Sequence, residues 1–174
     1  MDLSEQGSNW YAAFVETGKE DDVKTRLEYR FHDNIEFYVP KRELKERKGG
    51  VWRKTIKTLF PGYILIKGHL NTEDYYKFKN IPNLWKLLLC GKEILPIPYD
   101  EIRIISRFID DGEIIGISNV WEENGQVKVK DGPLKGMEGS IVKIDRRKNR
   151  AKVKISFLGQ DRLIDLSINL LVNT

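Results

Sequence analysis

TLFPGYILIK, which spans residues 58–67, joins an aromatic turn to a strongly apolar segment. Pro61-Gly62 is typical of a chain reversal. The short apolar run that follows favours a strand, so we expect a strand over this range, entered through Phe60–Tyr63. Both alternating faces of the strand are apolar, and the same is true of Trp10–Val15. Helices can cover one face. The other face is buried either by other parts of the same domain, which is the commoner arrangement, or by a partner protein.

A helical pattern follows the strand over Trp10–Val15. Apolar residues spaced four apart from Val23 to Phe31 predict a helix over residues 19–32. Thr17 is the expected N-cap of this helix, and Glu20 stands at the spacing that would complete a capping box.

The remaining elements of the N-terminal part mix strands and helices. We expect a strand over Ile35–Pro40 and a hairpin over Lys41–Lys57, with its turn at Gly49-Gly50. A short helix should run from Thr72 to Lys79. Another should follow Pro98, with its isoleucines on one face. This order predicts an α+β fold in which helices cover an antiparallel sheet.

The last third of the chain alternates apolar and polar residues in short segments separated by turn-forming residues, which predicts a small β-barrel. The segments are residues 127–130, 140–144, 151–155 and 163–166. In such a barrel, valines such as Val129 and Val153 point inward and lysines such as Lys128 point outward. These patterns divide the chain into a flexible tail (1–8), an α+β domain (9–109), a linker (110–123) and the barrel (124–174).

Composition argues against several classes of protein. The chain is 40% hydrophobic, enough for a core, but no stretch approaches the roughly 20 apolar residues of a membrane span. The start lacks a signal-peptide core, so we expect a cytoplasmic protein that does not contact a membrane. Cys90 is the single cysteine, and His32 and His69 lack the spacing of metal ligands, so we expect no disulfide, metal or cofactor. The glycines of residues 132–139 are not followed by the Gly-Lys-Ser/Thr of a phosphate-binding loop, and we expect no enzyme.

The charge is unevenly distributed along the chain. Residues 1–123 carry 19 Lys and Arg against 21 Asp and Glu, a net charge of −2. Residues 124–174 carry 11 against 5, a net charge of +6. A basic segment of this kind indicates a polyanionic partner.

Short motifs along the chain resemble those of the NusG family, non-enzymatic transcription factors that ride on RNA polymerase and promote elongation. The motifs of the N-terminal (NGN) domain are WY at 10–11, GKE at 18–20 and LFPGY at 59–63. Those of the KOW domain are GQVKV at 125–129, DGP at 131–133 and GMEG at 136–139. The resemblance implies an NGN-like antiparallel-sheet α/β sandwich followed by a small SH3-like β-barrel, and it makes residues 9–109 the polymerase-binding domain.

The resemblance also implies where polymerase binds. In the family, the N-terminal domain lays an apolar groove over the clamp helices of RNA polymerase, which would supply the cover that the two-faced strands need. The matching groove residues are Phe14, Phe60, Tyr63 and Leu65. The segment matching the part that reaches across the channel is Asp74, Tyr75, Tyr76 and Lys77. The alternative for the groove residues is that the aromatic turn at residues 60–63 only packs the core. We expect the protein to be a monomer and to have nontemplate DNA as a further partner.

The KOW domain departs from the general members of the family. Those proteins bind Rho or a ribosomal protein through an aromatic residue after Gly-Pro and an Ile-Phe-Gly-Arg-like loop. The matching residues here are Leu134 and Phe157–Gln160. Leucine stands at both aromatic anchor positions, Leu134 and Leu158, and Gln160 stands at the position of the arginine. These departures, together with WYAAFVETGKE at residues 10–20, look most like LoaP, a specialised NusG paralogue that acts as an antiterminator. Alternating and β-branched residues favour a stable barrel over the helical hairpin that the KOW domain of RfaH can form.

Basic residues of the barrel indicate RNA as the partner. Arginine offers paired contacts to phosphate, and structured RNA is recognised largely by shape and backbone contacts. We therefore expect a leader hairpin to bind here, a solvated charged surface being the alternative. The candidate RNA-binding residues are Lys128, Lys130, Lys135, Arg146, Arg147, Lys148, Arg150, Lys152 and Lys154.

Three functions follow from these patterns, in order of preference. The first is a processive antitermination and elongation factor that binds the polymerase clamp helices and structured RNA. The second is a general NusG elongation factor whose KOW domain binds Rho or a ribosomal protein. The third is a free-standing KOW RNA-binding protein.

Overall fold

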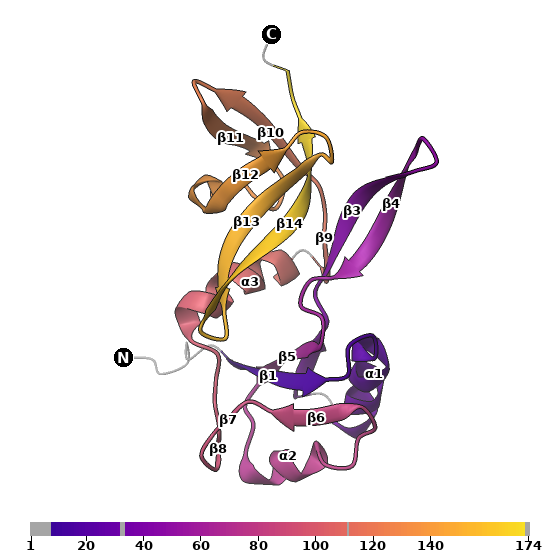
Figure 1. The fold of residues 1–174 in the computed structure, drawn as a ribbon. Helices are drawn as coiled ribbons and strands as arrows, with labels where there is room; N and C mark the ends of the chain where they lie inside the picture. Colours follow the sequence, from indigo (N-terminus) through magenta and orange to yellow (C-terminus); the bar gives the residue numbers. More distant parts are fainter. Residues whose placement is uncertain (1–7, 32–33, 111, 173–174) are drawn as a thin grey trace. The chain divides into compact units, whose positions relative to one another are not determined.

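The computed structural model describes residues 8–31, 34–110 and 112–172 and forms two compact units (Figure 1). The first unit contains the described residues up to Val39 together with Phe60–Tyr99. The second contains Pro40–Leu59 and the described residues from Asp100 onward. His32 and most of the tail expected over residues 1–8 lie outside the described residues.

The first unit is built on a four-stranded sheet with the strand order β2-β5-β1-β6, in which β1 pairs antiparallel with both β5 and β6. The strands are β1 (Asn9–Val15), β2 (Glu36–Tyr38), β5 (Tyr63–Gly68) and β6 (Leu84–Leu87), with a small hairpin of β7 (Leu89–Cys90) and β8 (Glu93–Ile94). The helices are α1 (Glu20–Arg30) and α2 (Thr72–Lys77). The predicted strand over residues 58–67 begins only at Tyr63, because Gly62 adopts a positive φ of 86° and turns the chain first.

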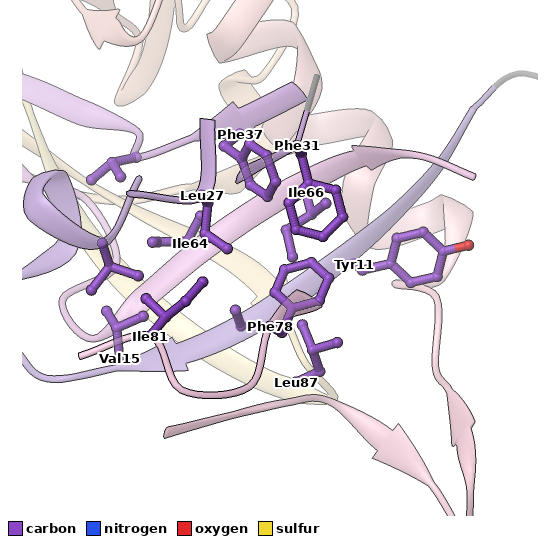
Figure 2. Close-up of a cluster of buried hydrophobic side chains, with 13 residues drawn as sticks. Tyr11, Val15, Leu27, Phe31, Phe37, Ile64, Ile66, Phe78, Ile81 and Leu87 are labelled. Atoms are coloured by element: carbon purple, nitrogen blue, oxygen red, sulfur yellow. The ribbon is translucent and has the colours of Figure 1, made fainter. Parts of the chain in front are cut away.

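The main core of this unit lies on one face of the sheet (Figure 2). Tyr11, Val15 and Ile66 project from β1 and β5 into it, and Leu27 of α1 packs among them. Phe31 packs against Phe78 with the two rings tilted and their centroids 4.7 Å apart. The four-residue spacing that predicts α1 therefore marks its buried face, as expected of an amphipathic helix.

The caps of the two helices correct the sequence interpretation. The N-cap of α1 is Lys19, and Thr17 does not cap it. Glu20 instead accepts hydrogen bonds from the backbone N–H groups of Gly18 (2.9 Å) and Gly62 (2.8 Å), and it is buried. These charge-assisted bonds tie the start of α1 to the turn before β5. In α2 the cap is Asn71 rather than Thr72, and Asp74 completes the capping box.

The second unit is rich in strands. Its five-stranded, barrel-like sheet has the order β11-β10-β14-β13-β12. The strands are β10 (Ser118–Glu123), β11 (Gln126–Asp131), β12 (Ile141–Asp145), β13 (Arg150–Phe157) and β14 (Gln160–Leu170), with a 3-10 helix over Glu138–Ser140. Val129 and Val153 are buried while Lys154 is exposed, so the alternation predicted from the sequence is confirmed there.

Three further elements belong to the second unit. A hairpin of β3 (Lys41–Lys48) and β4 (Val51–Thr58) turns at Gly49-Gly50, as predicted, and β3 pairs in parallel with β9 (Ile114–Ile115). Helix α3 (Tyr99–Asp110) follows Pro98 and buries its isoleucine face. The grouping differs from the boundaries expected from the sequence, which assign the hairpin and α3 to the N-terminal domain.

Strand β10 differs most from expectation, because it lies in the range predicted to be a linker. It pairs antiparallel with β11 and in parallel with β14, so it occupies an inner position of the sheet. Val120 in its middle is fully buried. Residues 118–123 are therefore part of the barrel core and not a connecting segment.

Candidate functional site

An accessible aromatic pair lies on the sheet of the first unit. Phe14 of β1 stands directly opposite Tyr63 of β5, and the centroids of their rings are 5.1 Å apart. Both side chains are partly exposed. The ammonium group of Lys86, on β6, lies 5.2 Å from the centre of the Phe14 ring. Such a pair presents apolar area that a partner can bury, and the lysine adds a cation–π contact.

The other two predicted groove residues are not accessible. Leu65 is fully buried and Phe60 is 2% exposed, so the prediction of one exposed patch containing all four residues is wrong. On the same face as Leu65, Ala12 is also fully buried and Trp10 is 9% exposed, with its ring 5.3 Å from that of Tyr38. This part of the second face is therefore buried and not exposed.

The predicted segment on α2 is divided between structural and accessible residues. Asp74 accepts the backbone N–H of Asn71 at 3.0 Å and receives a hydrogen bond from Lys77, so its carboxylate stabilises the helix start. Tyr75 is half-buried. Tyr76 is exposed, and the ammonium of Lys79 lies 4.8 Å from its ring centre. Tyr76 is the exposed aromatic side chain of this segment, and Lys77 is exposed as well.

In the second unit, the residues that match the usual protein-binding positions are partly buried, while Gly159 and Gln160 of the loop are exposed. Leu134, at the position of the expected aromatic, is fully buried, and so is Phe157. The carboxylate of Glu101, on α3, accepts hydrogen bonds from the backbone N–H groups of Leu158 (2.8 Å) and Gly159 (2.9 Å). Leu158 adopts a positive φ of 52°, a conformation that such a turn must stabilise in a residue with a side chain. No motif in the sequence predicts this role for Glu101.

The candidate RNA-binding residues fall into two groups. Several are engaged with acidic partners: Arg146 with Glu122, Arg150 with Glu46 (3.5 Å) and Asp165 (3.8 Å), Lys152 with Asp165 (3.9 Å) and Lys154 with Asp161 (3.3 Å). The hydrogen bond from Ser156 and then that from Lys154 hold the pKa of Asp161 below its ordinary value. Lys135 donates its ammonium to the carbonyl of Val129.

Arg147, Lys148 and Lys130 form the more available group, because all three are exposed and, across the described ranges, none forms an ion pair within 4.0 Å. Lys128 is half-buried on β11. The Arg146–Glu122 ion pair links the β12–β13 turn to β10, which is the neighbour of β11. The structure therefore brings the turn close to β10, while Lys152 and Lys154 project from β13.

In the part of the chain that the structure describes, no group of three or more His, Cys, Asp and Glu side chains is placed to hold a metal ion. Over the same residues, no helix has the length and apolar character needed to cross a membrane.

Comparison with known proteins identifies the family of the chain. Residues 8–106 match the family model described as transcription termination factor nusG, and residues 123–154 match the KOW motif. The chain belongs to the NusG family. NusG proteins are transcription factors and not enzymes.

Relatives match over nearly the whole chain. The transcription termination/antitermination protein NusG of Rickettsia prowazekii is 30% identical, over 92% of this chain and 87% of its own length. That of Halalkalibacterium halodurans is 28% identical, over 91% of this chain and 94% of its own. A solved structure on domain interaction in Thermotoga maritima NusG superposes with a TM-score of 0.58 at 24% identity, covering 92% of this chain and 93% of that one. The likeness confirms the predicted α+β fold with NGN and KOW domains.

Proposed function

We propose that this NusG-family chain is a processive transcription antitermination and elongation factor. It binds the clamp helices of RNA polymerase through the first unit and structured RNA through the basic barrel. The observation that carries the proposal is the Phe14–Tyr63 pair, which lies inside the segment that matches the NusG model and stays partly exposed on a sheet face whose next residues, Ala12 and Leu65, are buried.

The polymerase surface in this proposal is smaller than the sequence predicts. Phe14 and Tyr63 contact the clamp helices directly, and Lys86 flanks them. Phe60 and Leu65 are buried and stabilise the turn and the strand that carry Tyr63. Tyr76 is the side chain of α2 best placed for the second polymerase contact or for nontemplate DNA. An aromatic residue at the centre of a contact commonly dominates the binding energy of an interface.

RNA is the partner that we propose for the barrel. Exposed cations around Arg147 and Lys148 support this, since phosphate contacts supply most of the affinity of proteins for nucleic acid. The expected ligand is a hairpin in the leader of the regulated transcript.

The LoaP-like specialisation is favoured over general NusG activity by one specific observation. The loop that would contact Rho or a ribosomal protein has a buried Leu134 and a turn whose amides are bonded to Glu101. A general NusG factor remains the second candidate, and binding of Rho or a ribosomal protein by the barrel would favour it. Family membership over residues 8–106 argues against the third, a free-standing KOW protein.

Transcription in vitro through terminators tests the proposal as a whole. A template that carries the candidate leader should show increased read-through when the protein is added, and a template with the leader hairpin scrambled should not. The control is the Tyr63→Ala variant, which should not increase read-through on either template. Equal read-through with and without the leader would support a general elongation factor instead.

A further inference from the structure

The β3–β4 hairpin docks on the barrel through several specific polar contacts. Arg42 donates from its guanidinium to the carbonyl of Asp165 at 2.7 Å. Burial lowers the pKa of Arg42, a tendency that the nearby Asp165 carboxylate opposes. Lys45 donates its backbone N–H to the Ser167 hydroxyl (3.1 Å) and its ammonium to Asn169 (2.6 Å). These contacts hold the base and middle of the hairpin against strand β14.

Glu46 positions the hairpin relative to the β12–β13 turn. Its carboxylate accepts from Lys57 across the hairpin (2.5 Å) and from Arg150 of the barrel (3.5 Å). The hydrogen bond from Lys57 keeps the pKa of Glu46 below its ordinary value.

A cleft opens between the hairpin tip and the β12–β13 turn. Its volume is about 790 Å³, and six cations line it: Lys45, Arg47, Lys48, Arg147, Lys148 and Arg150. Glu46 is the single carboxylate among the lining residues, and it is already shared by Lys57 and Arg150. Exposed Lys48 and Arg147 form no ion pair in the described segments, so positive charge from two different hairpins converges on one hollow.

Trp52 distinguishes this cleft from a purely charged surface. It lies on β4 directly opposite Arg47, lines the same cleft and leaves 43% of its surface uncovered. Burying a tryptophan is favourable, so one left uncovered beside cations indicates a partner with a flat, apolar face and a negative charge. Unpaired nucleotides have both features. Stacked bases within an A-form duplex do not expose their faces, and the duplex major groove is too deep and narrow for side chains.

We propose that the cleft binds a single-stranded segment of RNA, with an unpaired base stacked on Trp52 and its phosphates held by cations of both hairpins. The inference rests on the proposed RNA binding of the barrel and adds the β3–β4 hairpin to that site. The duplex part of an RNA hairpin contacts the barrel turn, and its loop or flanking nucleotides enter the cleft. Recognition of unpaired bases by aromatic stacking combined with a basic groove is the common mode for single strands.

Fluorescence anisotropy with the full-length protein tests this assignment. The probes are a labelled oligouridylate of about eight nucleotides, within the usual site size for such grooves, and a blunt-ended RNA duplex of matched charge. Trp52→Ala should weaken oligouridylate binding at least about fivefold, the lower limit for loss of one stacked base. Trp52→Phe should restore most of the affinity, and duplex binding should not change.

Two further variants complete the design. Trp85→Ala removes a tryptophan that is 70% exposed on the first unit and serves as the matched control, with no expected effect on either probe. Lys48→Ala with Arg147→Ala removes one cation from each hairpin and should reduce the salt dependence of oligouridylate binding by about 1.4 slope units, at about 0.7 per phosphate contact.

The outcomes separate this inference from the proposed function. If Trp52→Ala leaves oligouridylate binding unchanged, or weakens both probes equally, while Arg146→Ala with Arg147→Ala weakens duplex binding, the cleft assignment is wrong and the RNA-binding barrel stands. If neither RNA binds, or if an acidic peptide such as oligo-aspartate competes as well as RNA, the proposed RNA function fails and the cleft assignment fails with it.

Discussion

Two regions of the molecule match surfaces that bind protein partners in the NusG family, and they differ in how exposed their side chains are. In the first unit, Phe14 and Tyr63 form an accessible aromatic pair. In the second, Leu134 is fully buried and the amides of Leu158 and Gly159 are bonded to Glu101. An aromatic anchor left uncovered can bind a partner, whereas a buried leucine and a turn with satisfied amides contribute only to the fold. The difference is that the first unit keeps a partly exposed aromatic pair, whereas the matching positions of the barrel are buried or hydrogen-bonded within the unit.

The largest effect should come from substitution of Leu65, which is buried and is expected to stabilise the fold, unlike the partly exposed Tyr63 on the same strand. Leu65→Ala leaves a cavity in a fully buried position, so the free energy of unfolding should fall by about 2–5 kcal/mol. Chemical denaturation of the variant would measure it. A stable Leu65→Ala protein with impaired polymerase binding would instead show that Leu65 belongs to the binding surface.

Tyr63→Ala should show the opposite behaviour. Because the side chain is partly exposed, its removal should weaken binding to core RNA polymerase by roughly 1–3 kcal/mol, as for a typical interface anchor, with a smaller loss of stability. Titration of the variant against labelled core polymerase gives the affinity, and a thermal melt gives the stability. Unchanged affinity in a folded Tyr63→Ala protein would remove the aromatic pair from the interface.

Substitution of Arg146 and Arg147 tests whether the charged surface of the barrel binds RNA independently of the aromatic surface of the first unit. Arg146→Ala with Arg147→Ala should lower RNA affinity and reduce its salt slope by about one unit per lost phosphate contact. Polymerase binding through Phe14 and Tyr63 should stay the same. Gel-shift titrations at two salt concentrations, with scrambled RNA as competitor, provide the measurement. Indifference to the double substitution would identify these arginines as a solvated surface, in line with the Arg146–Glu122 ion pair.

The smallest effect concerns the turn held by Glu101. Glu101→Ala removes the charged acceptor for the amides of Leu158 and Gly159; a hydrogen bond to a charged group contributes at most about 1.5–3 kcal/mol, and these two bonds are partly or fully exposed. Hydrogen exchange of these two amides should therefore accelerate, while amides in the middle of β13 stay protected. Equal protection in the variant would mean that the turn is stabilised by other contacts, including the buried Phe157 beside it.

Periodicity and turn chemistry predicted most of the secondary structure. The four-residue spacing in α1, the Gly49-Gly50 turn and the alternation in β13 each reflect a local rule, because a residue's direction along a helix or strand follows from backbone geometry. Caps were less predictable. Glu20 matches a capping box by spacing, yet its carboxylate bonds Gly62, 42 residues away, because burial of the turn offers it a second backbone donor.

Of the candidate site, the sequence predicted the residue types but not their exposure. Tyr63 and Leu65 share one face of a strand, and no local pattern reveals that one is accessible and the other fully buried. The cations of residues 146–154 were equally recognisable, but their ion pairs with Asp161, Asp165 and Glu46 involve partners on other elements.

By itself, the sequence determined the family, the α+β class, the strand-rich C-terminal part and the concentration of positive charge there, since composition, periodicity and motif spacing are all local properties of the chain. Tertiary structure alone decided that residues 118–123 are an inner strand of the barrel and that the β3–β4 hairpin lies against β14. It alone placed Trp52 and Arg147, which are far apart in the sequence, on the same cleft. The physical reason is that strand pairing and side-chain docking between distant segments depend on which surfaces remain to be buried after the local elements have formed.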